Sequence, residues 1–331
     1  MRQRTSLSEI AAIVLAAGKS TRMKSELPKV LHEVCGRPML SFVLNACRLA
    51  GVDRMYVVVG HGKELVMDRY RGESDLTFVE QREQKGTGHA VLCCREALSD
   101  FSGPLLVIAG DMPLVRRESL AGLYESMQNS DDACTIATTL LDDPAGYGRI
   151  VRDAEGELVD IIEHADCTPE QREIREVNPS YYCFDAKSLF GALAKVAPAG
   201  PKEEYYLTAA LRILRDDGKL ISANLQVPSE DAMGINSRVD LALLGRVMQD
   251  RLQRAMLEDG VTIVDPDNTW IEAETTVGRD TVIQPFTFIG AGATIGEGCQ
   301  LGPFARIAAG ESVPASAVVG PMSALSIGAM A

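Results

Sequence analysis

The chain has 331 residues, of which 46% are hydrophobic, so it is long enough to fold into two domains with sizeable cores. Its net charge is −13 at pH 7, which argues against nucleic acid as the main partner, because a phosphate backbone binds to a basic surface. A nucleotide substrate is compatible with this charge, since a few local cations and a metal ion can hold a polyphosphate.

Further patterns bear on where the protein works. Residues 1–9 are polar and lack the apolar core of a signal peptide. The eight cysteines form no C-x-x-C pair, which indicates free thiols in a reducing cytoplasm, and the four histidines have no spacing typical of a zinc site. Residues 312–331 carry no charge, but their prolines and glycines make a poor bilayer helix. We therefore expect a cytoplasmic protein with neither a nucleic-acid nor a membrane partner.

The first two thirds of the chain alternate short apolar runs with amphipathic stretches. Residues 10–15, 55–59 and 105–109 are rich in Val, Ile and Leu, which is typical of buried parallel strands. Residues 39–50 and 89–98 lie between such runs and have helical periodicity. This alternation predicts an α/β fold with a doubly wound, mostly parallel sheet, whose ligands bind at the carboxyl ends of the strands.

Residues 237–258 predict one long helix. Ser237 is a good N-cap and Gly260 is a good stop signal. Apolar residues recur at spacings of three and four, so we interpret the helix as a linker that packs on its neighbours.

Beyond Gly260 the sequence follows a six-residue repeat. Ten aliphatic residues occur six positions apart: Ile271, Val277, Ile283, Ile289, Ile295, Leu301, Ile307, Val313, Val319 and Leu325. Glycine follows the aliphatic residue in several repeats, where a small residue permits a tight corner. The pattern predicts a short parallel β-helix of hexapeptide repeats, with each aliphatic side chain pointing into the coil.

The loop after the first predicted strand, residues 15–23, reads LAAGKSTRM. Its small residues let backbone N–H groups approach a polyphosphate, and Arg22 and Lys29 add positive charge nearby. By itself this is a weak signal, because the loop matches neither the Walker motif nor G-x-G-x-x-G.

Longer motifs are far more specific. Residues 15–39 read LAAGKSTRMKSELPKVLHEVCGRPM, and the later motifs follow in order: Gln81 with residues 85–90, residues 110–114, residues 143–150, 162–164, 176–178, 204–208 and 234–238. Together they closely resemble the uridyltransferase half of the bifunctional bacterial enzymes that make UDP-N-acetylglucosamine. The resemblance extends from about residue 10 to residue 308.

The chain departs from the family pattern at a few positions. Ser20 stands where the family usually has glycine. Pro179 and Ser180 replace the usual Thr-Gly, and Ala209 replaces the usual Asp. The last three residues lie near the expected sugar, so a different sugar, such as glucose 1-phosphate, stays open.

The resemblance implies a Rossmann-like fold of the nucleotide-diphospho-sugar transferase type, followed by a left-handed β-helix. The expected domains are a nucleotidyltransferase domain over residues 1–236, a linker helix over 237–259 and a hexapeptide-repeat domain over 260–331. The family's β-helices form trimers, so we expect a homotrimer.

The resemblance also implies the reaction. UTP and N-acetylglucosamine 1-phosphate would give UDP-N-acetylglucosamine and pyrophosphate, which makes the protein a UDP-N-acetylglucosamine diphosphorylase. The sugar phosphate is already an ionised nucleophile, so the enzyme has to align the reactants and stabilise the developing charge. A non-catalytic relative that binds nucleotide sugars as a regulator is the alternative from another class.

The family's site residues map onto this chain motif by motif. The resemblance implies Mg²⁺ held by Asp111 and Asn236, whose oxygens suit that ion, although Asp111 alone could be an acidic turn residue. Arg22 and Lys29 would be catalytic. The nucleotide would contact Leu15, Ala16, Ala17, Gly18, Lys29, Gln81, Gly86, Thr87, Ala109, Gly110 and Asp111. The sugar phosphate would contact Gly148, Glu163, Asn178, Glu204, Tyr206, Thr208 and Asn236.

One of these expectations concerns the side chain of Gln81. The amide of Gln81 can donate and accept together, as a pyrimidine edge requires.

We expect no acetyl transfer to glucosamine 1-phosphate, the family's second activity. In the family that reaction occurs on a longer β-helix and uses a histidine base. All the histidines lie at or before His164, and Arg279 and Arg306 are the only Lys or Arg residues after Gly260.

Overall fold

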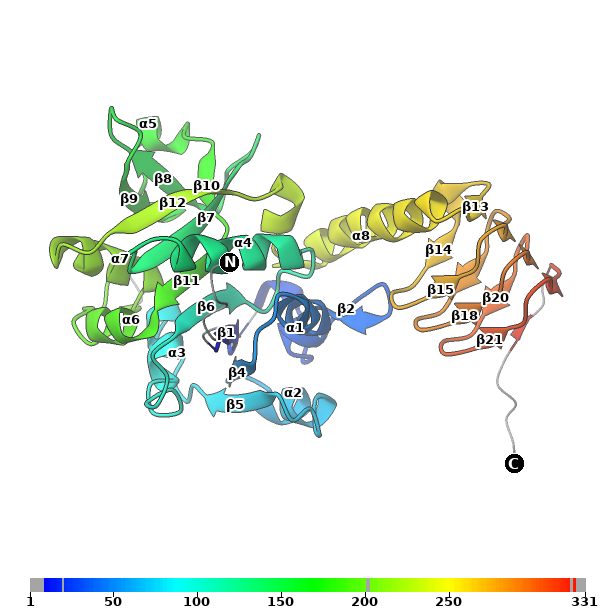
Figure 1. The fold of residues 1–331 in the computed structure, drawn as a ribbon, viewed down its shortest axis with the longest axis horizontal. Coiled ribbons are helices and arrows are strands. Elements are labelled where there is room, and N and C mark those ends of the chain that lie inside the picture. Colours follow the sequence, from blue (N-terminus) through cyan, green and yellow to red (C-terminus); the bar gives the residue numbers. More distant parts are fainter. Residues whose placement is uncertain (1–8, 20, 201–202, 322–323, 326–331) are drawn as a thin grey trace, which may run out of the picture. The chain divides into compact units, whose positions relative to one another are not determined.

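The computed structural model describes residues 9–19, 21–200 and 203–321, and the backbone of residues 324–325. The chain divides into two compact units (Figure 1). The first consists of Met1–Leu31 and Met39–Asn236, and the second of His32–Pro38 and Ser237–Ala331.

A sheet of ten described strands forms the centre of the first unit. One half of it is parallel and runs in the order β5 (Leu76–Glu80), β4 (Arg54–Val59), β1 (Ala11–Ala16) and β6 (Pro104–Ala109). β4, β1 and β6 match the three predicted apolar runs to within a residue at each end, whereas β5 was not among the predictions. β1, β4 and β6 are almost entirely apolar because helices cover both faces of the sheet, whereas the edge strand β5 is only partly buried and contains Thr77 and Glu80.

The other half of the sheet is mixed. It continues with β11 (Tyr181–Asp185), β7 (Cys134–Leu140), β10 (Glu176–Asn178), β8 (Gly148–Arg152) and β9 (Leu158–Ile162), and β12 (Ile221–Gln226) pairs with β7. Only the β7–β12 pair is parallel in this described half, because short connections such as that between β8 and β9 join antiparallel strands. The predicted α/β fold class is confirmed, with this mixed half as an addition.

Helices cover both faces of this sheet. On one face α1 (Met39–Leu49) packs against α4 (Arg117–Gln128). The other face carries α3 (Thr87–Cys93), α6 (Ala186–Leu193) and α7 (Leu207–Asp216) over a large apolar cluster. The remaining helices of this unit are α2 (Lys63–Arg69), α5 (Pro169–Arg172), η1 (Thr21–Met23), η2 (Lys29–Leu31), η3 (His164–Asp166) and η4 (Ser229–Ala232).

The helix expected over residues 89–98 is shorter than predicted. It ends at Cys93, where the N–H of Cys94 donates to the carbonyl of Val91 and the N–H of Arg95 donates to Leu92. These tighter bonds turn the backbone out of the α-helix.

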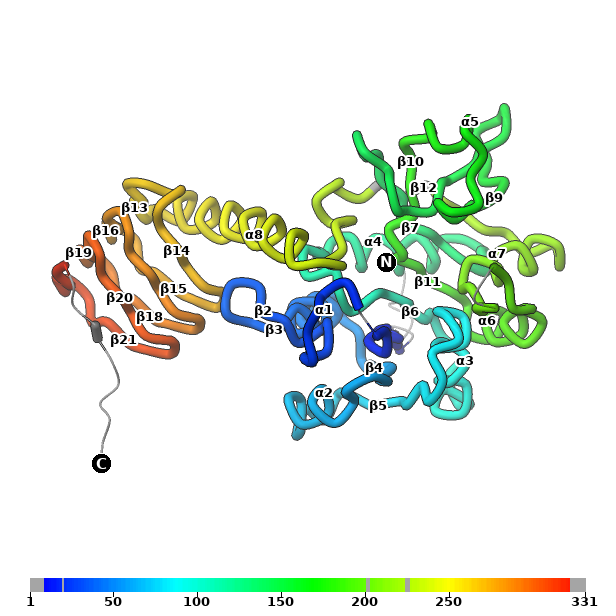
Figure 2. Tube along the Cα trace, turned by 180° about the vertical axis from the view of Figure 1, so that it is seen from behind, coloured from blue at the N-terminus to red at the C-terminus, as the bar shows by residue number. Residues whose placement is uncertain are grey.

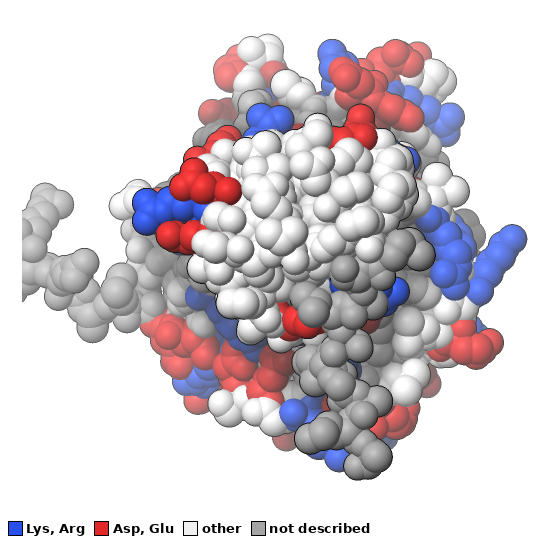
Figure 3. Space-filling model, turned by 90° about the vertical axis from the view of Figure 1, so that its right-hand side faces the viewer, with Lys and Arg blue, Asp and Glu red and all other residues white. Residues whose placement is uncertain are grey.

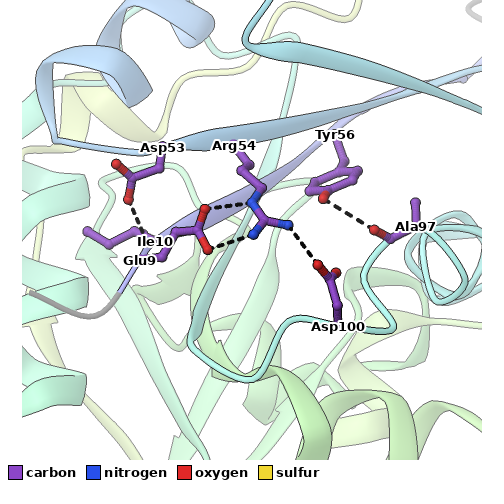
Figure 4. A network of polar contacts seen from close by, with 7 residues as sticks. All are labelled: Glu9, Ile10, Asp53, Arg54, Tyr56, Ala97 and Asp100. Carbon is purple, nitrogen blue, oxygen red and sulfur yellow. Dashed lines mark hydrogen bonds and ion pairs between the residues drawn. The ribbon is translucent and has the colours of Figure 1, made fainter.

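A polar network holds the amino ends of the parallel strands (Figure 4). Arg54, at the start of β4, makes a bidentate contact with Glu9 at 2.6 and 2.7 Å and reaches Asp100 at 3.4 Å. The N–H of Ile10 donates to Asp53 at 2.9 Å. These contacts fix the edge of the sheet opposite to the carboxyl ends, where ligands of such folds bind.

The second unit begins with a well-capped helix. In α8 (Arg238–Glu258) the Ser237 hydroxyl accepts from the N–H of Asp240, whose carboxylate accepts from the N–H of Ser237 in return. This capping box confirms the predicted start of the helix. The helix packs on β2 (Glu33–Val34), β13 (Thr262–Ile263) and β14 (Trp270–Ile271) of its own unit. Strand β2 forms a hairpin with β3 (Arg37–Pro38).

The six-residue repeat forms stacked coils of two-residue strands (Figure 2). Three parallel sheets run along the coils. Their strands are β13 (Thr262–Ile263), β14 (Trp270–Ile271), β15 (Thr276–Val277), β16 (Val282–Ile283), β17 (Phe288–Ile289), β18 (Thr294–Ile295), β19 (Gln300–Leu301), β20 (Arg306–Ile307), β21 (Ser312–Val313), β22 (Val318–Val319) and β23 (Ala324–Leu325), with η5 (Pro266–Asn268) before β14.

The aliphatic positions of the repeat form the core of the coil. Ile271 pairs with Ile289, and Ile289 pairs with Ile307 on the next coil, so equivalent residues stack. From Ile271 to Val319 these side chains are buried, except for Val277, which is partly buried, and the side chain of Leu325 lies outside the described residues. A Cβ at Gly296 would lie 2.4 Å from the N atom of Ala315, so the coils approach too closely there for any larger residue.

Among the described residues, no helix has the length and apolarity needed to span a bilayer.

Candidate functional site

A cavity of about 430 Å³ opens in the first unit, where β1 and β6 end at their carboxyl sides. Predicted nucleotide-binding residues line it: Leu15, Ala16, Ala17, Gly18, Lys29, Gln81, Gly86, Thr87, Ala109 and Asp111. Gly110 lies behind this lining, and its N–H donates to the Leu15 carbonyl at 2.9 Å. A Cβ at Gly18 would meet no atom within 4 Å, so the backbone there is open to a ligand.

Four predicted residues meet in one charged cluster. Lys29, in η2, forms an ion pair with Asp111, just after β6. The Lys29 ammonium also donates to the Asn236 side-chain oxygen at 3.1 Å. Arg22, in η1, donates to that same oxygen at 2.9 Å. The expected catalytic cations therefore contact the expected metal ligands.

The geometry of this cluster fits a hydrated Mg²⁺. Asp111 and Asn236 each direct an oxygen at the Lys29 ammonium, so the two oxygens can serve one cation. Mg²⁺ is usually held by one or two protein oxygens, with water and phosphate completing the octahedron.

The amide of Gln81 is held in one orientation. Its nitrogen donates to the Gly86 carbonyl and to Nδ1 of His89, both at 3.0 Å, and the side chain is only 3% exposed. A flipped amide would place its oxygen against the Gly86 carbonyl, which disfavours that orientation. Both amide hydrogens are thus engaged inside the protein. The amide can offer a ligand its oxygen, which narrows the expectation that it would donate and accept together.

The loop around Gly86 is joined to the 204–208 motif. Gly86 has φ +96°, and a Cβ there would lie 2.7 Å from the Tyr205 carbonyl oxygen, so glycine is required. The N–H of Tyr205 donates to the Lys85 carbonyl, and the N–H of Leu207 donates to the Thr87 hydroxyl. This junction brings two predicted sugar-binding residues, Glu204 and Tyr206, into the lining of the cavity.

Other predicted sugar-binding residues gather at one end of the β8–β9–β10 ladder, outside that lining. Gly148, the first residue of β8, pairs with Asn178 in β10, and Glu163 follows β9 directly. The Thr208 hydroxyl donates to the Glu163 carboxylate at 3.1 Å. Burial raises the pKa of Glu163 above its ordinary value, and this bond from Thr208 opposes the shift.

Asn178 is buried, and both its amide nitrogen and its amide oxygen form hydrogen bonds. Its nitrogen donates to the Tyr182 hydroxyl at 2.5 Å, and its oxygen accepts from the N–H of Ser180 at 3.0 Å. Burial raises the pKa of the Tyr182 hydroxyl, so it stays protonated. Ser180 has φ +65°, the left-handed conformation that a glycine at this family position would adopt freely. Ala209 packs against the apolar cluster of the first unit.

Some residues near the site were not among the sequence predictions. Lys19, Val30, Gln84 and Ala90 also line the cavity. Lys19, Val30 and Ala90 lie inside the recognised motifs, and this position in the motifs was the sequence signal from which they could have been predicted. Gln84 lies between motifs, and its side chain donates to the Gln81 carbonyl at 3.1 Å, a contact that only the fold reveals.

Comparison with protein families matches both units. Residues 12–212 match the model of the MobA-like NTP transferase domain, and residues 274–309 match the bacterial transferase hexapeptide, six repeats.

Curated relatives carry the name "Bifunctional protein GlmU". The protein from Geotalea daltonii is 43% identical over 279 residues, which cover 84% of this chain and 61% of the relative. The Geobacillus thermodenitrificans protein is 44% identical over 277 residues, covering 83% of this chain and 60% of that protein. The chain thus spans about three fifths of the length of these relatives.

Solved structures share the fold of the first unit at low sequence identity. A putative glucose-1-phosphate thymidylyltransferase from Bacillus anthracis, in complex with sucrose, has a TM-score of 0.62 at 17% identity and covers 73% of this chain and 96% of its own. A UDP-glucose pyrophosphorylase complexed with UDP-glucose has a TM-score of 0.58 at 19% identity, covering 74% of this chain and 100% of its own.

Proposed function

Because the chain belongs to the family of MobA-like NTP transferase domains, we propose that it transfers uridylyl groups from UTP to N-acetylglucosamine 1-phosphate. The products are UDP-N-acetylglucosamine and pyrophosphate. The observation that carries the proposal is the cluster of Arg22, Lys29, Asp111 and Asn236 beside the cavity. The relatives' printed name adds support for the family but not for the substrate.

In this reaction a phosphate oxygen of the sugar phosphate attacks the α-phosphorus of UTP. The bond from that phosphorus to the bridging oxygen breaks, and pyrophosphate leaves with the electron pair. No general base is required, because the attacking oxygen is already ionised. Arg22 and Lys29 act by holding the triphosphate and stabilising the charge of the transition state.

Asp111 and Asn236 are the residues that would hold Mg²⁺. When bound, the ion supplies positive charge to the phosphate oxygens. Lys29 would then move from these oxygens to the phosphates, because one position cannot hold two cations. Gln81 would accept from the N–H of the base, which in uracil lies at N3.

The sugar would lie against the ends of β8, β9 and β10. Glu163 would accept from sugar hydroxyls, beside the end of the ladder where Gly148 pairs with Asn178. Glucose 1-phosphate is the second candidate acceptor, suggested by Pro179, Ser180 and Ala209, which depart from the family pattern close to Asn178 and Thr208. In this proposal residues 1–236 form the nucleotidyltransferase domain that carries out the reaction. Residues 237–259 form a helix that links this domain to residues 260–331, and the repeat domain formed by residues 260–331 mediates oligomerisation.

Assembly as a homotrimer is part of the proposal. Figure 3 shows a broad face of the repeat unit without Lys, Arg, Asp or Glu at its centre. Residues 312–321 carry no charge, and Val318 is 77% exposed. Phe286 and Phe304 are half-exposed and stack with ring centroids 4.9 Å apart. Burying such surface against copies of the chain would be favourable. Light scattering that shows a monomer at micromolar concentration would contradict it.

A cytoplasmic location stays a prediction, supported by the eight free cysteines of the described chain. We further propose that the residues present do not transfer acetyl groups to glucosamine 1-phosphate. Residues 261–331 contain no histidine and no lysine, so the repeat lacks an imidazole base. Acetyl-coenzyme A and glucosamine 1-phosphate should release no free thiol, and enzyme-dependent thiol release would overturn this statement.

The main test is a panel of sugar 1-phosphates offered with UTP and Mg²⁺, with pyrophosphate release as the readout. N-acetylglucosamine 1-phosphate should give the highest kcat/KM. Preference for glucose 1-phosphate would support the second candidate, and no release with any sugar would refute both.

A further inference from the structure

The side chain of Arg149 is buried without an acidic partner. It lies in β8 next to Gly148 and is only 1% exposed, the largest of the fully buried side chains described. Among the described residues, no carboxylate lies within ion-pair distance of it, and its Nε has no hydrogen-bond partner. A buried guanidinium is costly, so its remaining contacts must be strong or serve another purpose.

The contacts of Arg149 all go to neutral acceptors. Nη1 donates to the Tyr147 carbonyl at 2.5 Å. Nη2 lies 3.3 Å from Nδ1 of His164 and 3.3 Å from the Arg172 carbonyl. Because a guanidinium has donors only, Nδ1 of His164 is the acceptor in this contact.

Two of these acceptors, Nδ1 of His164 and the Arg172 carbonyl, lie near the two ends of one segment, residues 163–172. The segment begins at Glu163, continues through η3 and ends with α5 at Arg172. Within the segment, the N–H of Asp166 and the thiol of Cys167 both donate to the Glu163 carbonyl. These bonds connect the turn at the start of the segment to the backbone of Glu163. The guanidinium therefore ties both ends of the segment to β8.

We propose that Arg149 is a positioning residue for the sugar phosphate. It holds residues 163–172 against β8, so that the Glu163 carboxylate stays beside Thr208, at the end of the ladder where Gly148 pairs with Asn178. This inference rests on the proposed function of Glu163. A position changed by a fraction of an ångström can cost a large factor in rate or affinity, even when the changed residue does not touch the substrate.

Arg149 has a matched control on the same strand. Arg152 also lies in β8 and is partly buried, but it makes a bidentate pair with Glu176 and donates to the Ala223 carbonyl. It has no contact with residues 163–172 among the hydrogen bonds of the described chain. Loss of Arg152 thus removes a structural arginine without releasing the segment.

The experiment compares Arg149→Met, Arg149→Lys and Arg152→Met with the wild type. For Arg149→Met we expect the KM for the sugar 1-phosphate to rise about 10- to 100-fold, while the KM for UTP stays within about twofold. Arg149→Lys should recover part of the loss, because an ammonium can still donate to some of the acceptors. Arg152→Met should change both KM values alike or neither.

Hydrogen exchange supplies a readout that does not need turnover. In Arg149→Met, the amides of residues 163–172 should exchange faster, while those of residues 81–90 stay as in the wild type. Equal rises in both KM values, or unchanged exchange in the segment, would overturn the inference. If the wild type turned over no sugar phosphate at all, the proposed function would fail, and the exchange result would still decide whether Arg149 holds the segment.

Discussion

Replacing Lys29 with methionine tests the charged cluster most sharply. Methionine keeps an unbranched chain of similar size but removes the ammonium that contacts Asp111 and Asn236. Two opposite effects should follow. Turnover should fall by about 10²–10³, the scale for losing one transition-state donor. Affinity for a divalent cation in the absence of nucleotide should rise, because the competing cation is gone.

The size of the second effect can be worked from the contacts. The Lys29 and Asp111 side chains are 15% and 19% exposed, so water screens their ion pair only in part. Hydrogen bonds to charged groups contribute roughly 1.5–3 kcal/mol. Since 1.4 kcal/mol is a factor of ten, Lys29→Met should tighten cation binding by about 10- to 100-fold.

Mn²⁺ titrated into nucleotide-free protein, with free Mn²⁺ followed by electron paramagnetic resonance, measures this affinity directly. Lys29→Arg is the matched control, because it keeps the positive charge and should leave the affinity near that of the wild type. Equal or weaker Mn²⁺ binding by Lys29→Met would show that the ammonium does not occupy the cation position, and the reasoning about the cluster would be wrong.

Other predictions concern the metal, the sugar and the coil. Asp111→Ala should lower turnover and weaken its dependence on Mg²⁺ concentration, and near-normal activity of this variant would remove Asp111 from the metal site. Burial raises the pKa of Glu163, so its carboxylate is protonated at a higher pH than that of an ordinary glutamate. The KM for the sugar phosphate should therefore rise as pH falls, starting at a higher pH than an ordinary glutamate would give, and Glu163→Gln should flatten that dependence when the two KM profiles are compared. Gly296→Ala should destabilise the protein by about 1–3 kcal/mol, because its Cβ would lie 2.4 Å from Ala315 N. Gly310→Ala, with φ +70° and no atom within 4 Å of the new Cβ, should cost only about 1 kcal/mol, and equal melting temperatures for the two variants would contradict the packing argument.

Local pattern was enough for much of the fold. The hexad spacing identified the coil because each aliphatic residue packs on its equivalent one turn away, as Ile271 does on Ile289. The strands at residues 10–15 and 105–109 were recognisable because burial on both faces demands an unbroken apolar run. The capping box at Ser237 involves residues only three positions apart.

Long-range contacts set the features that the sequence did not reveal. Residues 32–38 belong to the second unit. The Cys35 carbonyl accepts from the N–H of Ala273, a residue of that unit that lies far away in the sequence. The orientation of the Gln81 amide depends on His89, and the role of Arg149 depends on where residues 163–172 return to β8. Motif resemblance named the site residues, but only the fold shows which of them touch.

Uridylyl transfer by the first unit can be observed directly. The direct measurement is a ³¹P nuclear magnetic resonance spectrum of the protein with UTP, Mg²⁺ and N-acetylglucosamine 1-phosphate, recorded over time. We expect the UTP signals to give way to those of UDP-N-acetylglucosamine and an equal amount of pyrophosphate, and we expect this conversion to be lost in Lys29→Met. Unchanged UTP, or pyrophosphate formed together with UMP and no UDP-sugar, would contradict this expectation.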